Sequence, residues 1–325
     1  MKFLITGGFG LIGSRMCQLI RERYKDAEIV ICDMERHYLG FLAEDRHLYA
    51  SYFTYRSGLT KDATIYNVDT RHSFEMNDIL DAEKPDVIVH LAALPLAGIS
   101  RTISQEAFSS ICESTTGLLE CMRRTTPNSR FIFISSSMVY GDFEMDPMPE
   151  TGRCIPKSMY GASKLAGEVI SFGFGRTYNL DVRAVRPSAV YGPGDINQRV
   201  VELFIQKAKK GQPIHVKGAH SKLDFTYVDD IANGIIDVSV AENQAFEAFN
   251  ITSGDPRTLG ELIAELQKYF PDMDVRYDEF DTSVPVRGGL DVSKAREKVG
   301  YIPKFDFETG IRTYLDIEAR IIGND

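Results

Sequence analysis

The sequence predicts an α/β fold in which a doubly wound parallel sheet carries a smaller C-terminal α/β lobe. Three observations predict it. Short, almost wholly apolar segments alternate with helix-like segments through roughly the first 190 residues, as in parallel sheets that are covered on both faces. The first apolar segment runs into a glycine-rich turn, Thr6–Gly13. After Pro187, the alternation gives way to a stretch punctuated by proline and glycine.

The spacing of apolar residues places the individual elements. Phe3–Ile5 indicates the first strand, and Met16, Leu19 and Ile20 recur at helical spacing within residues 14–24. Further strands are predicted at 28–33, 64–68, 87–91, 131–134 and 182–185, and further helices at about 74–84, 104–124, 160–178, 200–210, 229–240, 259–270 and 306–321. Residues 36–63, rich in tyrosine and charge, receive no assignment.

The glycine-rich turn between the first strand and the first helix is typical of dinucleotide-binding Rossmann sheets. Gly7 permits a tight turn, Gly10 lets the backbone approach a pyrophosphate, and Gly13 lets helix and strand pack closely. The phosphates then lie at the positive end of the helix, facing free N–H groups. Glycine-rich turns also occur for purely structural reasons, so the prediction of a dinucleotide site needs a second observation, which the end of the second strand supplies.

That strand ends in Asp33, twenty residues after Gly13. An acid at this position accepts hydrogen bonds from the adenosine ribose and repels a 2′-phosphate, which favours NAD over NADP. A helix cap is the alternative interpretation of Asp33. Arg36 and His37 follow closely, and because these basic side chains suit a 2′-phosphate, NADP stays an alternative cofactor. We therefore predict a NAD-binding Rossmann lobe made of residues 1–186 and 223–252, and a substrate-binding lobe made of residues 187–222 and 253–325.

A second signal predicts acid–base chemistry. The fifth strand ends in a serine cluster, Ser135–Ser137, and Tyr160 and Lys164 lie four residues apart at the start of a helix, so they share one face. A neighbouring ammonium favours the phenolate, and lowering a phenol pKa from about 10 to about 7 needs roughly 4 kcal/mol. Ser136 could bridge the phenol and a substrate hydroxyl. We predict Ser136, Tyr160 and Lys164 as catalytic; an ordinary solvated helix surface is the alternative.

Composition and charge argue against a nucleic-acid-binding protein, a membrane protein and a metalloprotein. The net charge is −9, and no run of Lys and Arg resembles a phosphate-tracking stripe, so we expect no nucleic-acid partner. No segment has the length of a membrane span, and the N-terminus is not a signal peptide. The five cysteines and six histidines show no metal-ligand spacing. We therefore expect no metal, no disulfide and no membrane partner, and a cytoplasmic protein.

These motifs resemble the extended short-chain dehydrogenase/reductase superfamily, in its NAD-dependent epimerase/dehydratase branch. The resemblance covers essentially the whole chain. It rests on Thr6–Gly13, Asp33, Asp69, His90–Ala93, Ser135–Gly141, Tyr160–Lys164, Arg186–Gly194, Asp224–Asp230 and Arg287. Most members of that family hold NAD tightly and act on nucleotide-diphosphate sugars, so the resemblance implies NAD as cofactor and a nucleotide-diphosphate sugar as substrate.

The resemblance also implies roles for single residues. Val68 and Asp69 would flank the adenine, Pro187 and Ser188 would lie near the nicotinamide carboxamide, and Lys164 would also bond the nicotinamide ribose. The predicted cofactor-binding residues are Gly7, Gly10, Leu11, Ile12, Gly13, Asp33, Val68, Asp69, Leu91, Ala92, Ala93, Tyr160, Lys164, Pro187 and Ser188. The predicted substrate-binding residues are Ser136, Ser137, Tyr160 and Arg287. Arg287 would contact the diphosphate; a solvated loop charge is the alternative.

Departures from the family pattern narrow the expected function. Ser137-Met138 stands where the 4,6-dehydratases carry Asp-Glu, and neither side chain is a general acid or base near neutral pH. Leu223 replaces a usual Arg and Ala189 a usual Asn. We expect a nucleotide-sugar epimerase that acts at C4 through a transient 4-keto intermediate. The first alternative is a dehydrogenase that oxidises a sugar nucleotide or a smaller hydroxy compound, followed by a dehydratase or decarboxylase, and last by an inactive NAD-binding scaffold.

The resemblance further implies a homodimer, in which helices 104–124 and 160–178 pair across a two-fold axis. Leu118, Leu165 and Ile170 could serve in that interface. Burial in the core of a single chain is the alternative for these three residues.

Overall fold

The computed structural model describes residues 1–34, 45–94, 103–197, 199–282 and 284–323. Its centre is a seven-stranded parallel sheet in the order β11-β6-β5-β4-β1-β2-β3. The strands are β1 (Lys2–Thr6), β2 (Glu28–Asp33), β3 (Thr64–Asn67), β4 (Val87–His90), β5 (Arg130–Ile134), β6 (Asp181–Pro187) and β11 (Ala248–Ile251). Because the strand order reverses beside β1, the sheet is doubly wound, which confirms the predicted fold class.

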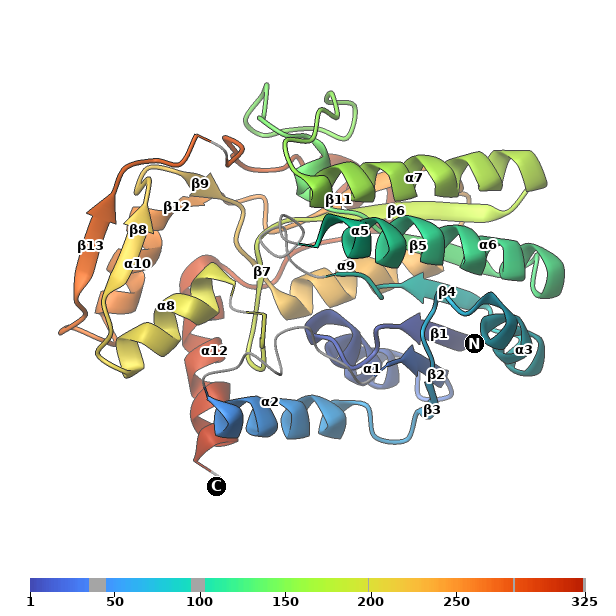
Figure 1. Ribbon diagram of the computed structural model, residues 1–325, viewed down its shortest axis with the longest axis horizontal. Coiled ribbons are helices and arrows are strands. Elements are labelled where there is room, and N and C mark those ends of the chain that lie inside the picture. Colours follow the sequence, from blue (N-terminus) through green and yellow to red (C-terminus); the bar gives the residue numbers. More distant parts are fainter. Residues whose placement is uncertain (35–44, 95–102, 198, 283, 324–325) are drawn as a thin grey trace.

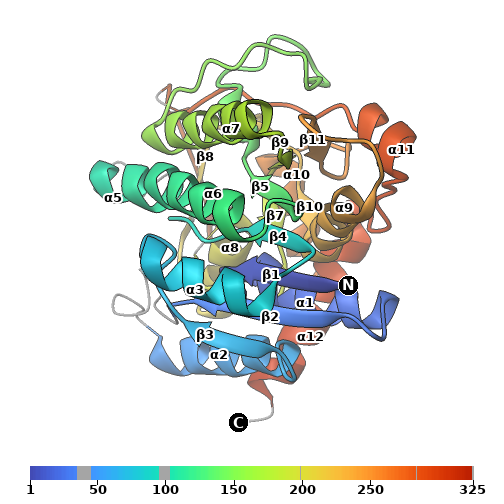
Figure 2. The ribbon, with the colours of Figure 1, turned by 90° about the vertical axis from the view of Figure 1, so that its right-hand side faces the viewer.

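Helices cover both faces of this sheet (Figure 2). α1 (Leu11–Arg23) and α9 (Val228–Val240) pack together on one face, and α3 (Ser73–Glu83), α6 (Ser114–Thr125) and α7 (Met159–Tyr178) lie on the other. The side chains of β1 show the division, since Phe3 and Ile5 belong to the first core and Leu4 to the second. Near-continuous apolar strands are thereby buried on both sides.

The predicted helix 104–124 forms with an irregularity. It consists of α5 (Ser104–Phe108), a π-helical turn at Ser109–Glu113, and α6. A π-turn takes an extra residue into one turn of a helix and often accompanies functional sites. Ser110, within this turn, accepts a hydrogen bond from the backbone N–H of Leu94 at 3.1 Å.

The structure adds elements that the sequence did not predict. α2 (Arg46–Leu59) lies within the unassigned stretch 36–63, is capped by the Asp45 carboxylate, and packs against α1 and α12 (Phe307–Ile322; Figure 1). The strand β11 and the short helix α11 (Ser293–Val299) were also missed.

The remaining elements stand beside the main sheet (Figure 1). They are three two-stranded pairs, β7 (Val190–Tyr191) with β10 (Thr226–Tyr227), β8 (Ile214–Lys217) with β13 (Val275–Asp278), and β9 (Lys222–Leu223) with β12 (Arg257–Thr258), together with α8 (Val200–Lys209) and α10 (Leu259–Gln267). The helices predicted at 200–210, 229–240, 259–270 and 306–321 are confirmed. One continuous apolar cluster joins this part to the sheet, since Leu262 and Ile311 share it with Phe3.

Within the described residues, none of the helices combines the length and the apolar character that crossing a bilayer demands. Leu118 is fully buried in the core beneath α6. Of the two interpretations open for Leu118, core packing is the correct one, so this residue does not supply an interface.

Candidate active site

The glycine-rich turn lies where β1 meets α1, and its close contacts require glycine. Gly7 has a φ of +72°, and a Cβ there would lie 2.9 Å from the backbone nitrogen of Ala92. A Cβ on Gly13 would lie 2.5 Å from the carbonyl oxygen of Gly7. α1 begins at Leu11 without a side-chain cap. Its first backbone N–H groups therefore remain available to an anion.

A pocket opens over this turn, which we call the cofactor pocket. It is lined by eleven of the predicted cofactor-binding residues, namely Gly7, Gly10, Leu11, Ile12, Gly13, Asp33, Val68, Asp69, Leu91, Ala92 and Ala93. The remaining lining is Cys32, Met34, Arg56, Thr70, Arg71, Ser110, Asn197 and Arg199. The fold thus brings residues from four separate segments of the predicted site together in one place.

Asp33 ends β2 at the rim of the cofactor pocket. Its Oδ2 accepts a hydrogen bond from the backbone N–H of Phe9 at 2.9 Å, which fixes the carboxylate beside the glycine turn. Asp33 does not cap α2, since Asp45 does, so the helix-cap interpretation is wrong for the described helix. Arg36 and His37 lie outside the described residues.

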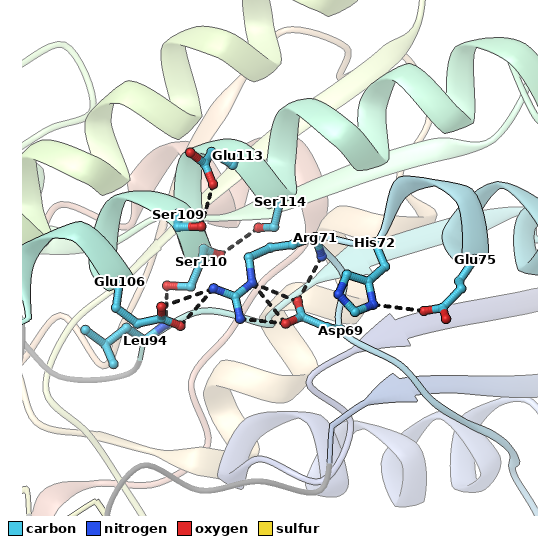
Figure 3. A network of polar contacts seen from close by, with 10 residues as sticks. All are labelled: Asp69, Arg71, His72, Glu75, Leu94, Glu106, Ser109, Ser110, Glu113 and Ser114. Atoms are coloured by element: carbon cyan, nitrogen blue, oxygen red, sulfur yellow. Dashed lines mark hydrogen bonds and ion pairs between the residues drawn. The ribbon is translucent and has the colours of Figure 1, made fainter.

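A polar network holds the wall of the pocket that carries Asp69 (Figure 3). Arg71 donates from Nη2 to Asp69 Oδ2 at 2.6 Å, and from Nη1 to Glu106 at 3.1 Å. Although burial opposes the effect, the hydrogen bonds from Arg71 lower the pKa of Asp69. The carboxylate of Asp69 is therefore kept charged and fixed in orientation beside the expected adenine position.

The catalytic candidates meet where α7 starts and β5 ends. Ser158 caps α7 by accepting from the N–H of Gly161 at 3.1 Å, which sets Tyr160 on the first turn. A Cβ on Gly161 would lie 2.5 Å from the carbonyl oxygen of Met138. Glycine at this position lets α7 approach the serine segment closely enough for Tyr160 to reach Ser136.

Tyr160 and Lys164 occupy a largely dehydrated environment. Burial raises the pKa of Tyr160, and the charge of Arg199 and a hydrogen bond with Ser136 oppose that rise. Lys164 is 4% exposed, donates to the carbonyl oxygen of Ile134 at 2.7 Å, and lies 5.8 Å from the centre of the Tyr160 ring. Burial lowers the pKa of Lys164 to about 8. The solvated-helix interpretation of this pair is therefore wrong.

A second pocket, the catalytic pocket, contains these residues and adjoins the cofactor pocket. The two share Ile12, Leu91, Ala93 and Arg199 as lining residues. All remaining predicted site residues line the catalytic pocket, namely Ser136, Ser137, Tyr160, Lys164, Pro187, Ser188 and Arg287. Its described lining contains no Asp, Glu or His side chain. Phenol, ammonium, hydroxyl and guanidinium are thus the polar side-chain groups that the described lining supplies.

Arg287 enters the catalytic pocket from a loop that is tied down on both sides. Before it, Asp142 Oδ1 accepts from the N–H of Val286 at 2.8 Å, and after it Asp146 Oδ1 accepts from the N–H of Gly289 at 2.8 Å. The Nε of Arg287 is buried and has no hydrogen-bond partner among the described residues. Burial lowers the pKa of Arg287 to about 10. The side chain is therefore a charged group facing a pocket rather than a solvated loop charge.

The two family departures also line the catalytic pocket. Leu223 pairs across β9 and β12 with Arg257, and it presents an apolar surface to the pocket. Ala189 has a φ of +32°, a conformation in which asparagine and glycine are more favourable than alanine. Both positions are thus placed to affect which substrate fits.

Sequence reasoning missed two arginines. Arg199 lines both pockets, and its Nη1 donates to both carboxylate oxygens of Asp195 at 2.8 and 2.9 Å. Arg56 lines the cofactor pocket from α2. The one available signal for Arg56 was its spacing of four residues from Tyr52, which places both on one helical face. No metal was predicted, and among the described residues no group of three or more His, Cys, Asp or Glu side chains is placed to hold one.

Comparison with known proteins places this site in a defined class. The model of the NAD dependent epimerase/dehydratase family matches residues 3–252. The chain therefore belongs to this family of NAD-dependent enzymes.

The curated relatives include proteins named as dehydratases and proteins named as epimerases. The dTDP-glucose 4,6-dehydratase of Neisseria meningitidis is 30% identical, with 97% of this chain and 93% of that protein covered. A trifunctional UDP-glucose 4,6-dehydratase, 3,5-epimerase and reductase of Arabidopsis thaliana is 27% identical over 97% of this chain but only 47% of its own length. The chain thus spans about half the length of the plant relatives that it matches.

Solved structures agree in fold. A UDP-glucose 4-epimerase from Thermotoga maritima, crystallised with UDP-glucose, superposes with a TM-score of 0.85 at 26% identity, covering 98% of this chain and 99% of that one. A dTDP-glucose 4,6-dehydratase from Streptomyces venezuelae with bound NAD gives a TM-score of 0.84 at 25% identity, with 97% of both chains covered. Epimerases and dehydratases thus share the fold of this family member, so the lining of the catalytic pocket has to distinguish between the two reactions.

Proposed function

We propose that the protein is a NAD-dependent nucleotide-sugar epimerase that inverts C4 through a transient 4-keto intermediate. The observation that carries the proposal is the catalytic pocket itself. It presents Ser136, Tyr160 and Lys164 beside the cofactor pocket, and its described lining contains no carboxylate or imidazole. Elimination of water needs an additional acid and base at the neighbouring carbon, whereas a reversible oxidation at one carbon needs only a single proton carrier.

Tyr160 is the proposed proton carrier. Its phenolate accepts the proton of the C4 hydroxyl as the ketone forms, and returns it when the alcohol is restored. Ser136, which is hydrogen-bonded to Tyr160, donates to the same substrate oxygen. The buried ammonium of Lys164 stabilises the phenolate electrostatically across the 5.8 Å to its ring.

The cofactor pocket fits NAD in its backbone geometry and its charges. Gly13 leaves open a space that a Cβ would fill, Asp33 stands at the rim, and the uncapped start of α1 offers N–H groups to a pyrophosphate. When bound, NAD supplies the hydride acceptor and donor for C4. Because no net oxidation occurs in an epimerisation, the pocket must retain the cofactor through the whole cycle.

Arg287 supports a diphosphate substrate. A guanidinium can donate two parallel hydrogen bonds to a phosphate, and this one has a buried Nε without a partner. The two departures at Leu223 and Ala189 favour a second candidate, a dehydrogenase that oxidises a sugar nucleotide or a smaller hydroxy compound, because both weaken the polar surface offered to a sugar nucleotide.

Product analysis distinguishes the two candidates. The purified protein is incubated with UDP-, GDP-, CDP- and dTDP-sugars that stabilise it in a thermal-shift screen, and the products are identified by NMR. For an epimerase we expect a C4 epimer at equilibrium with its substrate and no build-up of NADH. Stoichiometric NADH with an oxidised product would replace the epimerase by the dehydrogenase, and a 4-keto-6-deoxy product would indicate a dehydratase.

We also propose the two-lobe division at residues 187, 223 and 253, with the catalytic pocket between the lobes. Residues of both segments line that pocket, among them Tyr160 from the sheet lobe and Arg287 from the second. All five cysteines are free thiols, which supports a reducing compartment such as the cytoplasm.

A homodimer is proposed through the outer surface of α5 and α7. Phe108 and Val169 are 48% and 62% exposed there. Because a charge is strongly disfavoured in an apolar interface, Val169→Asp should convert a dimer into a monomer in light scattering at micromolar concentration. Ile302→Asp is the matched control, since Ile302 is 64% exposed and belongs to neither helix. A monomeric wild-type protein would contradict the proposal.

A further inference from the structure

Arg56 is a buried cation that the proposed reaction does not use. It lies on α2, which packs against α1 and α12 (Figure 1). Its side chain is 1% exposed, and its Nε and Nη2 have no hydrogen-bond partner among the described residues. The same side chain lines the cofactor pocket together with the glycine turn.

A buried guanidinium without hydrogen-bond partners lowers the stability of the ligand-free protein. Burying a guanidinium removes its hydration, and N–H groups without partners leave that loss uncompensated. Burial accordingly lowers the pKa of Arg56, and the nearby Asp195 and Asp33 carboxylates offset only part of this effect. An anion bound in the pocket would supply the missing hydrogen bonds and charge.

The position of Arg56 indicates which part of a dinucleotide meets it. The charges of two carboxylates, Asp195 and Asp33, both act on Arg56. Asp33 lies at the expected adenosine ribose, and Asp195 holds Arg199, which lines the cofactor pocket and the catalytic pocket alike. The Cγ of Arg56 lies 3.5 Å from where a Cβ on Gly194 would stand, so the loop after β7 fixes its stem. A dinucleotide whose adenosine ribose lies at Asp33 and whose nicotinamide lies at Tyr160 has its pyrophosphate between Asp33 and the junction of the two pockets.

We propose that Arg56 binds the pyrophosphate of NAD, so that α2 supplies a cationic contact in addition to the backbone N–H groups of the glycine turn. The contact concerns the cofactor alone and holds for an epimerase and a dehydrogenase alike. The pyrophosphate is then bound by uncharged backbone N–H groups at the start of α1 and by the desolvated guanidinium of Arg56. Because of the guanidinium, NAD retention depends on an element outside the glycine-rich motif.

The test compares ligands that contain and lack the pyrophosphate. Arg56→Met removes the charge at similar length, Arg56→Lys keeps it, and Arg46→Met is the control on the exposed face of the same helix. Calorimetry on cofactor-stripped protein gives the Kd for NAD, ADP-ribose and adenosine. For Arg56→Met we expect NAD and ADP-ribose to bind about 10- to 100-fold more weakly, the usual scale for a hydrogen bond to a charged group, with adenosine unchanged.

A thermal scan gives an independent readout. Without ligand, Arg56→Met should melt no lower than the wild type, because it removes an uncompensated buried charge. With saturating NAD, its gain in Tm should be smaller than that of the wild type. Arg56→Lys should keep most of the NAD affinity, and Arg46→Met should match the wild type throughout.

Three results would overturn the proposal. An unchanged NAD affinity in Arg56→Met would remove the contact. An equal loss for adenosine and NAD, with a lower Tm of the ligand-free protein, would make Arg56 a structural residue. A wild-type preference for NADP that Arg56→Met abolishes would assign the guanidinium to a 2′-phosphate instead.

Discussion

Replacing Tyr160 by phenylalanine should lower kcat by about two to four orders of magnitude, the usual scale for general acid–base catalysis. The substitution removes one oxygen atom and leaves the ring, so the packing at the start of α7 is preserved. NAD content and the KM for the sugar nucleotide should stay close to those of the wild type, because other residues make most of the binding contacts. The measurement is steady-state turnover together with the amount of nucleotide released on denaturation.

The matched control for this variant is Tyr178→Phe. Tyr178 ends the same helix and is 45% exposed, so loss of its hydroxyl should leave kcat unchanged. If Tyr160→Phe turned over its substrate at near-normal rate, another group would have to carry the proton. The described lining of the catalytic pocket offers Lys164 as the other titratable candidate near neutral pH, since the pKa of its ammonium is about 8.

Replacing Arg287 by glutamine should raise the KM for a sugar nucleotide by roughly 10- to 100-fold, because a hydrogen bond to a charged group contributes about 1.5–3 kcal/mol. At neutral pH the side chain is fully charged, since burial lowers its pKa only to about 10. kcat should change less than KM, because the proposed contact of Arg287 is to the diphosphate and not to the carbon that reacts. NAD retention should be unaffected, since Arg287 does not line the cofactor pocket.

Arg153→Gln provides the comparison, because the Arg153 side chain is 72% exposed and belongs to neither pocket. An unchanged KM in Arg287→Gln for every sugar nucleotide turned over would place the diphosphate elsewhere. It would also favour the dehydrogenase acting on a smaller hydroxy compound, for which no diphosphate contact is needed.

The choice between epimerase and dehydratase depends on Met138 and its surroundings. Relatives with both activities share this fold, so the fold alone does not distinguish them. Met138 lines the catalytic pocket, and its thioether carries no titratable proton. Since the described lining contains no other acid in its place, the pocket favours a reaction confined to one carbon.

The sequence was enough to predict the sheet, because short apolar segments that alternate with helices leave few arrangements other than a parallel sheet covered on both faces. It also identified the glycine turn, since the backbone at Gly7 and the contact at Gly13 exclude a side chain. α2 escaped prediction because its two buried positions are Tyr52 and Arg56, neither of which is an aliphatic residue that marks a buried helical face. β11 is four residues long, and only pairing with β6 makes it a strand.

Tertiary structure decided which charged residues belong to the site. Arg56 and Arg199 lie outside any local motif. Asp195 accepts hydrogen bonds from Arg199, and its charge also acts on Arg56, because α2 packs against the loop after β7. Packing of distant elements also forms the two pockets, since the catalytic pocket alone combines residues as far apart in the chain as Ile12 and Arg287. A local pattern reports the backbone conformation and the buried face of one element. Which charges lose their water, and which of them face a common ligand, depends on how distant elements pack together.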